Sequence, residues 1–234
     1  MIIDITPAID PGTPVWPGDV PFSLDPTWSI DSGDAVSVST VRSTTHVGAH
    51  IDAPSHVVAG APDVLQTPLE ACVGACLVVD VSGLVGSEGT PRAFAAAAEV
   101  RDSIARIAGI AGIAAGAQAP IERLLLRHTA THSAAGTVWD AGTVWDEAMP
   151  GVDPELVRWF GEQGGALIGV DLASFDSAAS KELPAHRVGI EHGIVLLEGL
   201  DLASAPEGFA ELIALPLPWR GADASPVRAV LRVP

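Results

Sequence analysis

Short, continuous apolar segments recur along this chain, and they constrain its fold more than any other feature. Each segment has the length of a β-strand, and strands that are apolar throughout are typical of sheets covered on both faces. Helix signals fall between several of these segments, so strands and helices alternate. We therefore expect an α/β fold, with strands at residues 75–81, 121–126, 166–170, 194–197, 212–217 and 227–233.

Two further strands are expected near the N-terminus. Residues 2–6 have the composition of a first strand. Residues 36–41 alternate apolar and polar side chains with period two, which is typical of a strand with one buried face. We expect these two strands to share a sheet.

Capping residues predict two helices. Thr90 followed by Pro91 is typical of a helix start, and an Ala-rich stretch runs from there towards Ile107. An aspartate and a proline likewise open a helix over residues 156–163, which two glycines end. The Pro-rich start of the chain and its closely spaced last strands favour a mixed sheet, so the predicted class is mixed α/β.

Nothing in the sequence divides the chain into domains. Its 24 glycines and 19 prolines are spread along it, which indicates many turns and no linker. With 234 residues, 48% of them hydrophobic, the chain is able to bury one sizeable core. We predict a single domain over residues 1–234, with a mixed sheet flanked by helices.

The charge balance restricts the possible partners. Twelve Lys and Arg stand against 29 Asp and Glu, which gives a formal net charge of −17. This charge repels nucleic-acid phosphates and anionic lipid headgroups. We therefore expect neither nucleic acid nor a membrane as a partner.

Several features predict a cytoplasmic location. The first residues lack a basic segment followed by an apolar one, so no secretory signal is expected. The most apolar tract, residues 104–119, is shorter than the ~20 residues of a spanning helix. Cys72 and Cys76, the two cysteines of the chain, are interpreted as small buried side chains and not as a disulfide.

A tandem duplication occupies residues 136–147, where GTVWDA is followed by GTVWDE. A unit this short forms no solenoid, and we interpret the duplication as a lengthened surface loop. The alternative is a lid that brings Trp139 or Trp145 over a ligand. His128 and His132 lie beside it and are expected to be solvated.

Three histidines and one aspartate crowd into eleven residues, from His46 to His56. In an extended chain the even-numbered positions 46, 50, 52 and 56 point to one side. Gly48 and Pro54 allow the backbone to bend around a common point. Imidazole nitrogens and a carboxylate suit a divalent cation such as zinc, and the two oxygens of a carboxylate are able to bridge two ions.

Further ligands are expected from distant parts of the chain. His186 follows a turn that contains a proline, and Glu198 ends an apolar segment, where a buried acid needs a charged partner. His192 is a weaker candidate, because a histidine beside a glycine at a helix end is common without a catalytic role.

The segment His46-x-Gly-Ala-His50-x-Asp52-Ala-Pro54-x-His56, preceded by TPVWPGD at residues 13–19, resembles the bacterial kynurenine formamidase (arylformamidase) branch of the cyclase family. The resemblance continues to Glu198-Gly199-Leu200 and covers most of the chain. It implies a single α/β domain of the swivelling β/β/α type. The Gly-Ala-His sequence favours the formamidase branch over the wider family.

The resemblance also assigns roles to residues. It implies that His46, His50 and Asp52 bind one zinc ion, and that Asp52, His186 and Glu198 bind a second, with Mn²⁺ as the alternative metal. His56 corresponds to the proton donor and acceptor of the family. Trp16 corresponds to the tryptophan that contacts the substrate; the less favoured alternative is a core tryptophan beside a Pro-Gly turn.

The implied activity is hydrolysis of N-formyl-L-kynurenine to L-kynurenine and formate, a step of tryptophan breakdown, by a cytoplasmic homodimer. The expected partner is thus a small aryl formamide. One alternative is a related cyclic amide hydrolase, for instance one acting on isatin. The other is a zinc-binding module without turnover, which an open coordination position argues against.

Overall fold

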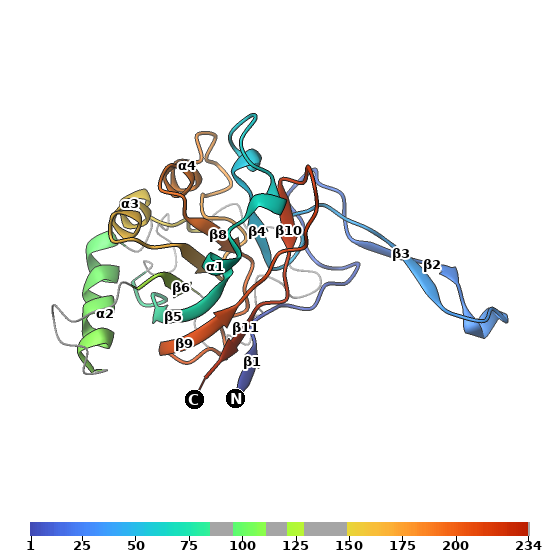
Figure 1. The fold of residues 1–234 in the computed structure, drawn as a ribbon, viewed down its shortest axis with the longest axis horizontal. Helices are drawn as coiled ribbons and strands as arrows, with labels where there is room; N and C mark the ends of the chain where they lie inside the picture. Colours follow the sequence, from blue (N-terminus) through green and yellow to red (C-terminus); the bar gives the residue numbers. More distant parts are fainter. Residues whose placement is uncertain (85–95, 111–120, 129–148, 234) are drawn as a thin grey trace.

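Nine strands form a mixed, curled sheet in the computed structural model, which describes residues 1–84, 96–110, 121–128 and 149–233 (Figure 1). Their order across the sheet is β1-β11-β9-β5-β6-β7-β8-β4-β10. The bounds are β1 Ile2–Asp4, β4 His50–Asp52, β5 Val73–Asp80, β6 Arg123–Arg127, β7 Leu167–Val170, β8 Val195–Glu198, β9 Gly208–Ile213, β10 Ala224–Pro226 and β11 Val230–Arg232.

The centre of the sheet is parallel. Strands β5, β6, β7 and β8 pair in parallel, and the pairs towards both edges are antiparallel. These four strands come from the continuous apolar segments of the sequence, and their side chains enter two cores on opposite faces. In β6, for example, Leu124 and Leu126 pack on one face and Leu125 on the other. The prediction of a mixed sheet with strands buried on both faces is therefore confirmed.

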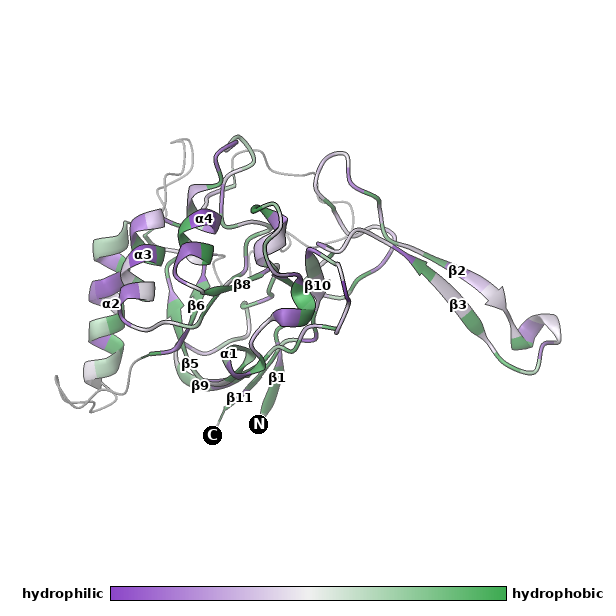
Figure 2. Cartoon of the chain, turned by 45° about the horizontal axis from the view of Figure 1, so that its top comes forward, coloured by the Kyte–Doolittle hydropathy of each residue, from purple (hydrophilic) through white to green (hydrophobic). Residues whose placement is uncertain are grey.

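Three helices cover one face of the sheet: α2 (Ala97–Ile110), α3 (Pro154–Glu162) and α4 (Pro184–Glu191), while the short α1 (Leu69–Cys72) leads into β5 (Figures 1 and 2). The start of α3 is as predicted, since the Asp153 side chain accepts a hydrogen bond from the backbone of Glu155. The expected cap of α2 at Thr90 lies outside the described residues.

The opposite face of the sheet holds the second core. Cys72 and Cys76 are both buried there as free thiols, as predicted. Burial raises the pKa of the two thiols to about 11 and about 12, so both are protonated at neutral pH. The prediction for the last strands was only partly right. Strand β9 spans Gly208–Ile213 and not residues 212–217, and β10 (Ala224–Pro226) was not predicted.

The expectation for residues 36–41 is wrong in two respects. Strand β3 (Val38–Arg42) does not join β1, because it pairs antiparallel with β2 (Ser23–Trp28) in a separate hairpin. Figures 1 and 2 show this hairpin as a long arm that projects from the body of the protein. All five residues of β3 are exposed, so its apolar positions, Val38 and Val41, do not face a core of this chain.

No helix among the described residues is both long enough and apolar enough to cross a membrane. The duplicated segment at residues 136–147, with Trp139, Trp145 and the neighbouring His132, lies outside the described residues.

Candidate metal centre

Strands β4 and β8 create the site by their register. They pair antiparallel with His50 opposite Glu198, which places the two side chains side by side on one face of the sheet. Asp52 is two residues along β4 and shares that face, whereas Ile51 between them enters the core on the other face. His50 Nε2 lies 3.2 Å from Glu198 Oε2 and 3.4 Å from Asp52 Oδ1.

His46 reaches the same point because the chain bends sharply before β4. Gly48 has a φ of 62°, a conformation that favours glycine, and a Cβ there would meet Ile9 Cγ1 at 2.9 Å. The bend predicted at this glycine is therefore present. It brings His46 Nδ1 to 3.0 Å from Asp52 Oδ1.

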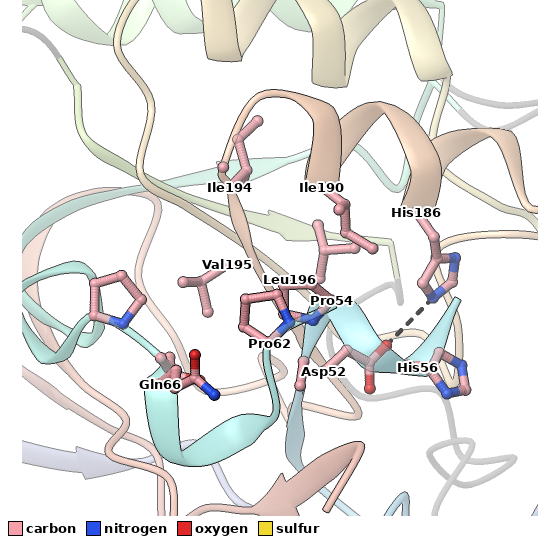
Figure 3. Close-up of a pocket in the computed structure, with 14 residues that line it drawn as sticks. Asp52, Pro54, His56, Pro62, Gln66, His186, Ile190, Ile194, Val195 and Leu196 are labelled. Carbon is pink, nitrogen blue, oxygen red and sulfur yellow. Dashed lines mark ion pairs between the residues drawn. The ribbon is translucent and has the colours of Figure 1, made fainter. Parts of the chain in front are cut away.

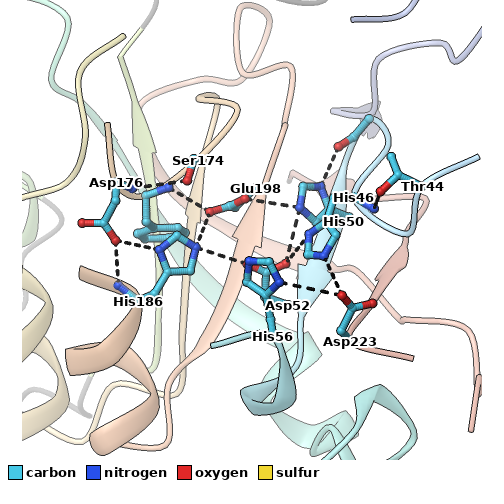
Figure 4. Close-up of polar contacts among 12 residues, drawn as sticks. Thr44, His46, His50, Asp52, His56, Ser174, Asp176, His186, Glu198 and Asp223 are labelled. Carbon is cyan, nitrogen blue, oxygen red and sulfur yellow. Dashed lines mark hydrogen bonds and ion pairs between the residues drawn. The ribbon is translucent and has the colours of Figure 1, made fainter. Parts of the chain in front are cut away.

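Helix α4 supplies the histidine on the other side of Asp52. His186 is in its first turn, with Nε2 at 3.3 Å from Asp52 Oδ2 and 3.1 Å from Glu198 Oε1. Each carboxylate thus turns one oxygen towards His186 and the other towards His50 (Figure 4). The structure brings together all five side chains that the sequence singled out as ligands, although helix α4 itself was not predicted.

Two cavities meet at this cluster. The larger, of about 420 Å³, is lined by His46, His50 and Glu198. The smaller, of about 220 Å³, lies between α4 and the segment after β4 and reaches Asp52 (Figure 3). His56 and His186 line both cavities.

His56 is at the edge of the cluster and is less buried than the ligand candidates. It ends a 3₁₀ helix, Pro54–His56, and its side chain is 30% exposed. Its ring centroid lies 4.3 Å from that of His46 and 5.9 Å from that of His186. Burial lowers the pKa of His56, in contrast to the other histidines of the site.

The cluster fits divalent cations. His50 Nε2 and both oxygens of Asp52 are buried and, although close to one another, have no hydrogen-bond partner with suitable geometry among the described residues. Buried polar atoms without partners are costly, so lone pairs that converge in this way are typical of a metal site. Ligand atoms of His50, Asp52 and Glu198 lie within 4.8 Å of one another, as do those of His46, Asp52 and His56.

The charges of the site also favour a cation at its centre. Burial opposes protonation of His50, but Asp52 and Glu198 outweigh it and raise the pKa of His50 to about 10. His186 is likewise buried, yet Asp176, Asp52 and Glu198 raise its pKa well above the ordinary value. Burial disfavours ionised Asp52, but three surrounding histidines hold its pKa well below the ordinary value. Metal ions compete with protons for such histidines.

Each candidate ligand histidine has a polar contact at the ring nitrogen that does not face the cluster. His50 Nδ1 lies 2.9 Å from the Gly48 carbonyl oxygen, so Nε2 is left to face the cluster. His186 Nδ1 lies 2.7 Å from Asp176 Oδ2, and His46 Nε2 lies 3.4 Å from Asp223 Oδ2. Asp176 also accepts hydrogen bonds from the backbone of Ala185 and His186, at 3.1 Å each.

Sequence reasoning missed Asp176 and Asp223. Neither lies near the histidine cluster in the sequence, and each reaches a ligand only through tertiary packing. The acid ten residues before His186 was the one available signal, and it had no meaning until α4 was known to begin at Pro184.

We expect Asp176→Asn to weaken metal binding by roughly 10- to 100-fold, the usual effect of losing a carboxylate behind a ligand histidine. The substitution removes the charge that orients the His186 ring and makes its Nε2 a stronger donor. A Zn²⁺ titration against a competing chelator measures the change. Asp102→Asn, on an exposed part of α2, is the matched control. Equal affinities in the two variants would show that Asp176 has no such role.

The remaining candidates from the sequence are placed as follows. Trp16 lines the larger cavity and is 36% exposed, which is not the burial of a core side chain. His192 caps the C-terminal end of α4 and lines neither cavity. His128 was expected to be solvated, and this is wrong: it is buried, and its backbone donates a hydrogen bond of 2.7 Å to Asp171 Oδ1.

Known proteins share this sequence pattern and fold. The family model Cyclase, described as "Putative cyclase", matches residues 3–177, a span that contains the cluster from His46 to His56. An isatin hydrolase bound to the product analogue thioisatinate is 21% identical, with a TM-score of 0.76 over 100% of this chain and 92% of that one.

Two further solved structures have the same fold. Isatin hydrolase A from Ralstonia solanacearum is 23% identical, with a TM-score of 0.75 over 99% of this chain and 91% of that one. A potential metal-dependent hydrolase with cyclase activity is 24% identical, with a TM-score of 0.71 over 100% of this chain and 99% of that one. The fold of these proteins therefore extends over the whole of this chain.

Proposed function

The chain belongs to the cyclase family, and we propose that it is a metal-dependent hydrolase that cleaves the C–N bond of aryl formamides. The proposed substrate is N-formyl-L-kynurenine, which gives L-kynurenine and formate. One observation carries the proposal: four of the five candidate metal ligands line a cavity that also contains a further histidine and a tryptophan. The fifth, Asp52, lies 3.0 to 3.4 Å from three of them. The Gly48-Ala49-His50 sequence resembles that of the formamidase branch of the family, which supports an aryl formamide as the substrate.

The five ligand side chains fit two divalent cations, Zn²⁺ in our proposal, with Mn²⁺ as the alternative. Bound there, such cations would supply Lewis acidity and lower the pKa of a water molecule towards ~7. The chain contributes the arrangement of donors, since Asp52 and Glu198 each present one oxygen to His186 and one to His50.

His56 is assigned the movement of a proton. An anilide nitrogen is a poor leaving group unless it is protonated, so hydrolysis needs a group that carries a proton to it. The His56 ring borders both cavities and is free of the close carboxylate contacts that hold the other histidines, since its nearest ion-pair contact is Asp223 at 3.8 Å. In the balanced reaction, the oxygen of water bonds to the formyl carbon, the C–N bond breaks, and His56 transfers a proton of the water to the leaving nitrogen.

An assay with metal analysis on the same sample tests the proposed function. We expect the purified protein to hydrolyse N-formyl-L-kynurenine, followed by absorbance, to lose this activity to a chelator, and to regain it with Zn²⁺. Isatin is tested in parallel. A protein that holds its metal ions but does not hydrolyse N-formyl-L-kynurenine would contradict the proposal.

Isatin hydrolysis is the second candidate function, because three of the similar solved structures are isatin hydrolases. The same ligands and His56 would serve a ring amide, and the difference lies in the shape of the larger cavity. A zinc module without turnover is less well supported, because cavities reach the ligands from two sides, whereas structural zinc sites are closed.

Trp16 distinguishes an aryl substrate from a small amide. If its indole stacks on the kynurenine ring, Trp16→Ala should raise KM roughly 2- to 10-fold for N-formyl-L-kynurenine, from a contact of about 0.5–1.5 kcal/mol. KM for N-methylformamide should stay unchanged. The thermal midpoint is measured as a control, because loss of a core tryptophan would cost about 3–5 kcal/mol and affect both substrates alike. An unselective, destabilised variant would end the assignment.

We also propose that the protein acts as a homodimer, as the resemblance implies. The arm formed by β2 and β3 supports this, because a two-stranded hairpin is marginal in water by itself and this one exposes Leu24, Trp28 and Val41. Light scattering during gel filtration should give about twice the 23.9 kDa of one chain, and a monomer would contradict the proposal.

A further inference from the structure

Lys181 is the one lysine of this sequence, and it lines the larger cavity of the candidate metal centre. The chain is strongly acidic, with 29 Asp and Glu against 12 Lys and Arg, so a high content of basic residues does not explain a lysine at this position. Apart from the histidines, Lys181 is the only basic side chain among the described residues that line the cavity. Trp16 lines the same cavity.

The backbone that carries Lys181 is fixed. Ser180 Oγ accepts a hydrogen bond of 3.2 Å from the Leu183 backbone, which closes the turn around Lys181. The Glu182 carbonyl accepts a bond of 2.8 Å from Arg187 Nε, which ties the turn to α4. Leu183 has a φ of 47° and is the only non-glycine residue with a positive φ in the described part of the chain. A conformation this costly persists where surrounding contacts impose it, and it is enriched at binding sites.

The ammonium of Lys181 is available to a ligand. Lys181 takes part in none of the ion pairs among the described residues, although three carboxylates line the same cavity. These three are engaged elsewhere: Glu198 with His50 and His186, Asp223 with Thr45 at 2.8 Å, and Asp19 with Thr44 at 3.1 Å. The wall of the cavity therefore includes one positive side chain that forms no ion pair among the described residues.

We propose that Lys181 binds a carboxylate of the substrate that is separate from the amide being hydrolysed. The substrate class is then an aryl formamide that bears a carboxylate, held with the carboxylate at Lys181 and the formyl group at the metal ligands. This inference rests on the proposed function and goes beyond it, because it makes Lys181 the determinant that separates such substrates from neutral amides, including isatin. An ammonium is a compact point charge, so it attracts a carboxylate without strict geometry.

The test compares two substrates that differ in one group, N-formyl-L-kynurenine and its α-carboxamide, in which the carboxylate becomes an uncharged amide of the same shape. For Lys181→Gln we expect KM for the carboxylate substrate to rise roughly 10-fold, a moderate value for a charged contact that is partly exposed to water. KM for the carboxamide and kcat for both substrates should stay within about twofold, because the variant does not touch the metal ligands.

Two further variants serve as controls. Lys181→Arg retains the charge and should restore most of the preference for the carboxylate. Arg158→Gln removes one positive charge from the surface of α3, outside both cavities, and should leave the preference unchanged. An equal preference in wild type and Lys181→Gln, or an equal loss on both substrates, would overturn the role of Lys181 while the formamidase activity stands.

A binding measurement separates failure of this inference from failure of the proposed function. Calorimetry with L-kynurenine and its α-carboxamide requires no turnover, and wild type should bind the carboxylate form more tightly, by a margin that Lys181→Gln removes. A wild-type protein that hydrolyses neither formamide would overturn the proposed function. A wild-type protein that hydrolyses both but binds the two products equally would overturn only the role of Lys181.

Discussion

Asp52→Asn is expected to release both metal ions and to leave no measurable turnover. Asp52 Oδ1 faces His46 and His50, and Oδ2 faces His186, so the substitution replaces a shared anionic ligand with a neutral amide. The amide nitrogen has no lone pair to donate, so the cation on that side would lose a ligand. The cation on the other side would keep an oxygen ligand, but one without negative charge. The metal content, measured by mass spectrometry, should fall from the roughly two ions per chain of a two-metal site to near none.

His186→Ala is the matched comparison for Asp52. It removes a ligand from one side only, so we expect the loss of mainly one ion and retention of the other. Far-UV circular dichroism on both variants shows whether the fold survives, because removal of one member of a buried charged cluster destabilises a protein. Equal, partial metal loss in the two variants would count against a bridging role for Asp52.

His56→Ala is expected to lower kcat by roughly 10²- to 10⁴-fold with both metal ions retained, which is the usual contribution of a general acid or base. The side chain is partly exposed and borders both cavities, so its removal should cost little stability. His192→Ala is the control, because it removes an imidazole from the end of α4, outside both cavities, and should leave kcat unchanged.

The metal content of His56→Ala decides between two roles. Ligand atoms of His46, Asp52 and His56 lie within 4.8 Å of one another, so the geometry also accommodates His56 as a ligand. Retained metal with low kcat supports proton transfer. Loss of an ion from the variant would reassign His56 to metal binding.

The sequence predicted the central strands because burial on both faces leaves a continuous apolar segment. Leu124, Leu125 and Leu126 show this, since adjacent side chains enter opposite cores. It did not predict the hairpin arm, because the alternation in β3 resembles that of a half-buried strand and nothing local shows whether a core lies beneath it. Helix α4 was missed because its N-cap is Leu183, in a left-handed conformation and without a side-chain cap, so it lacks the capping residue that marked α3.

For the candidate site, local spacing was informative and distant partners were not. His50 and Asp52 share a face because a strand alternates with period two, and that rule applies without knowledge of the rest of the fold. The positions of Asp176 and Asp223 depend on how α4 and the chain near β10 pack against the ligands. Lys181 belongs to the Ser180-Lys181 segment that carries part of the resemblance, but the sequence assigned it no role, because that role depends on the cavity wall that it joins.

The pairing of β4 with β8 also has a consequence for how the protein is made. Asp52 and His186 are separated by more than half of the chain, so a ribosome must complete most of the protein before the two ends of the site exist together. A nascent chain of which only the part up to β4 has left the ribosome presents two or three histidines and one carboxylate. Such a set is a weak and unselective chelator. Selective uptake of metal at the proposed site would thus be a late event in biogenesis, which begins once α4 and β8 have docked beside β4 and closed the long loop between them.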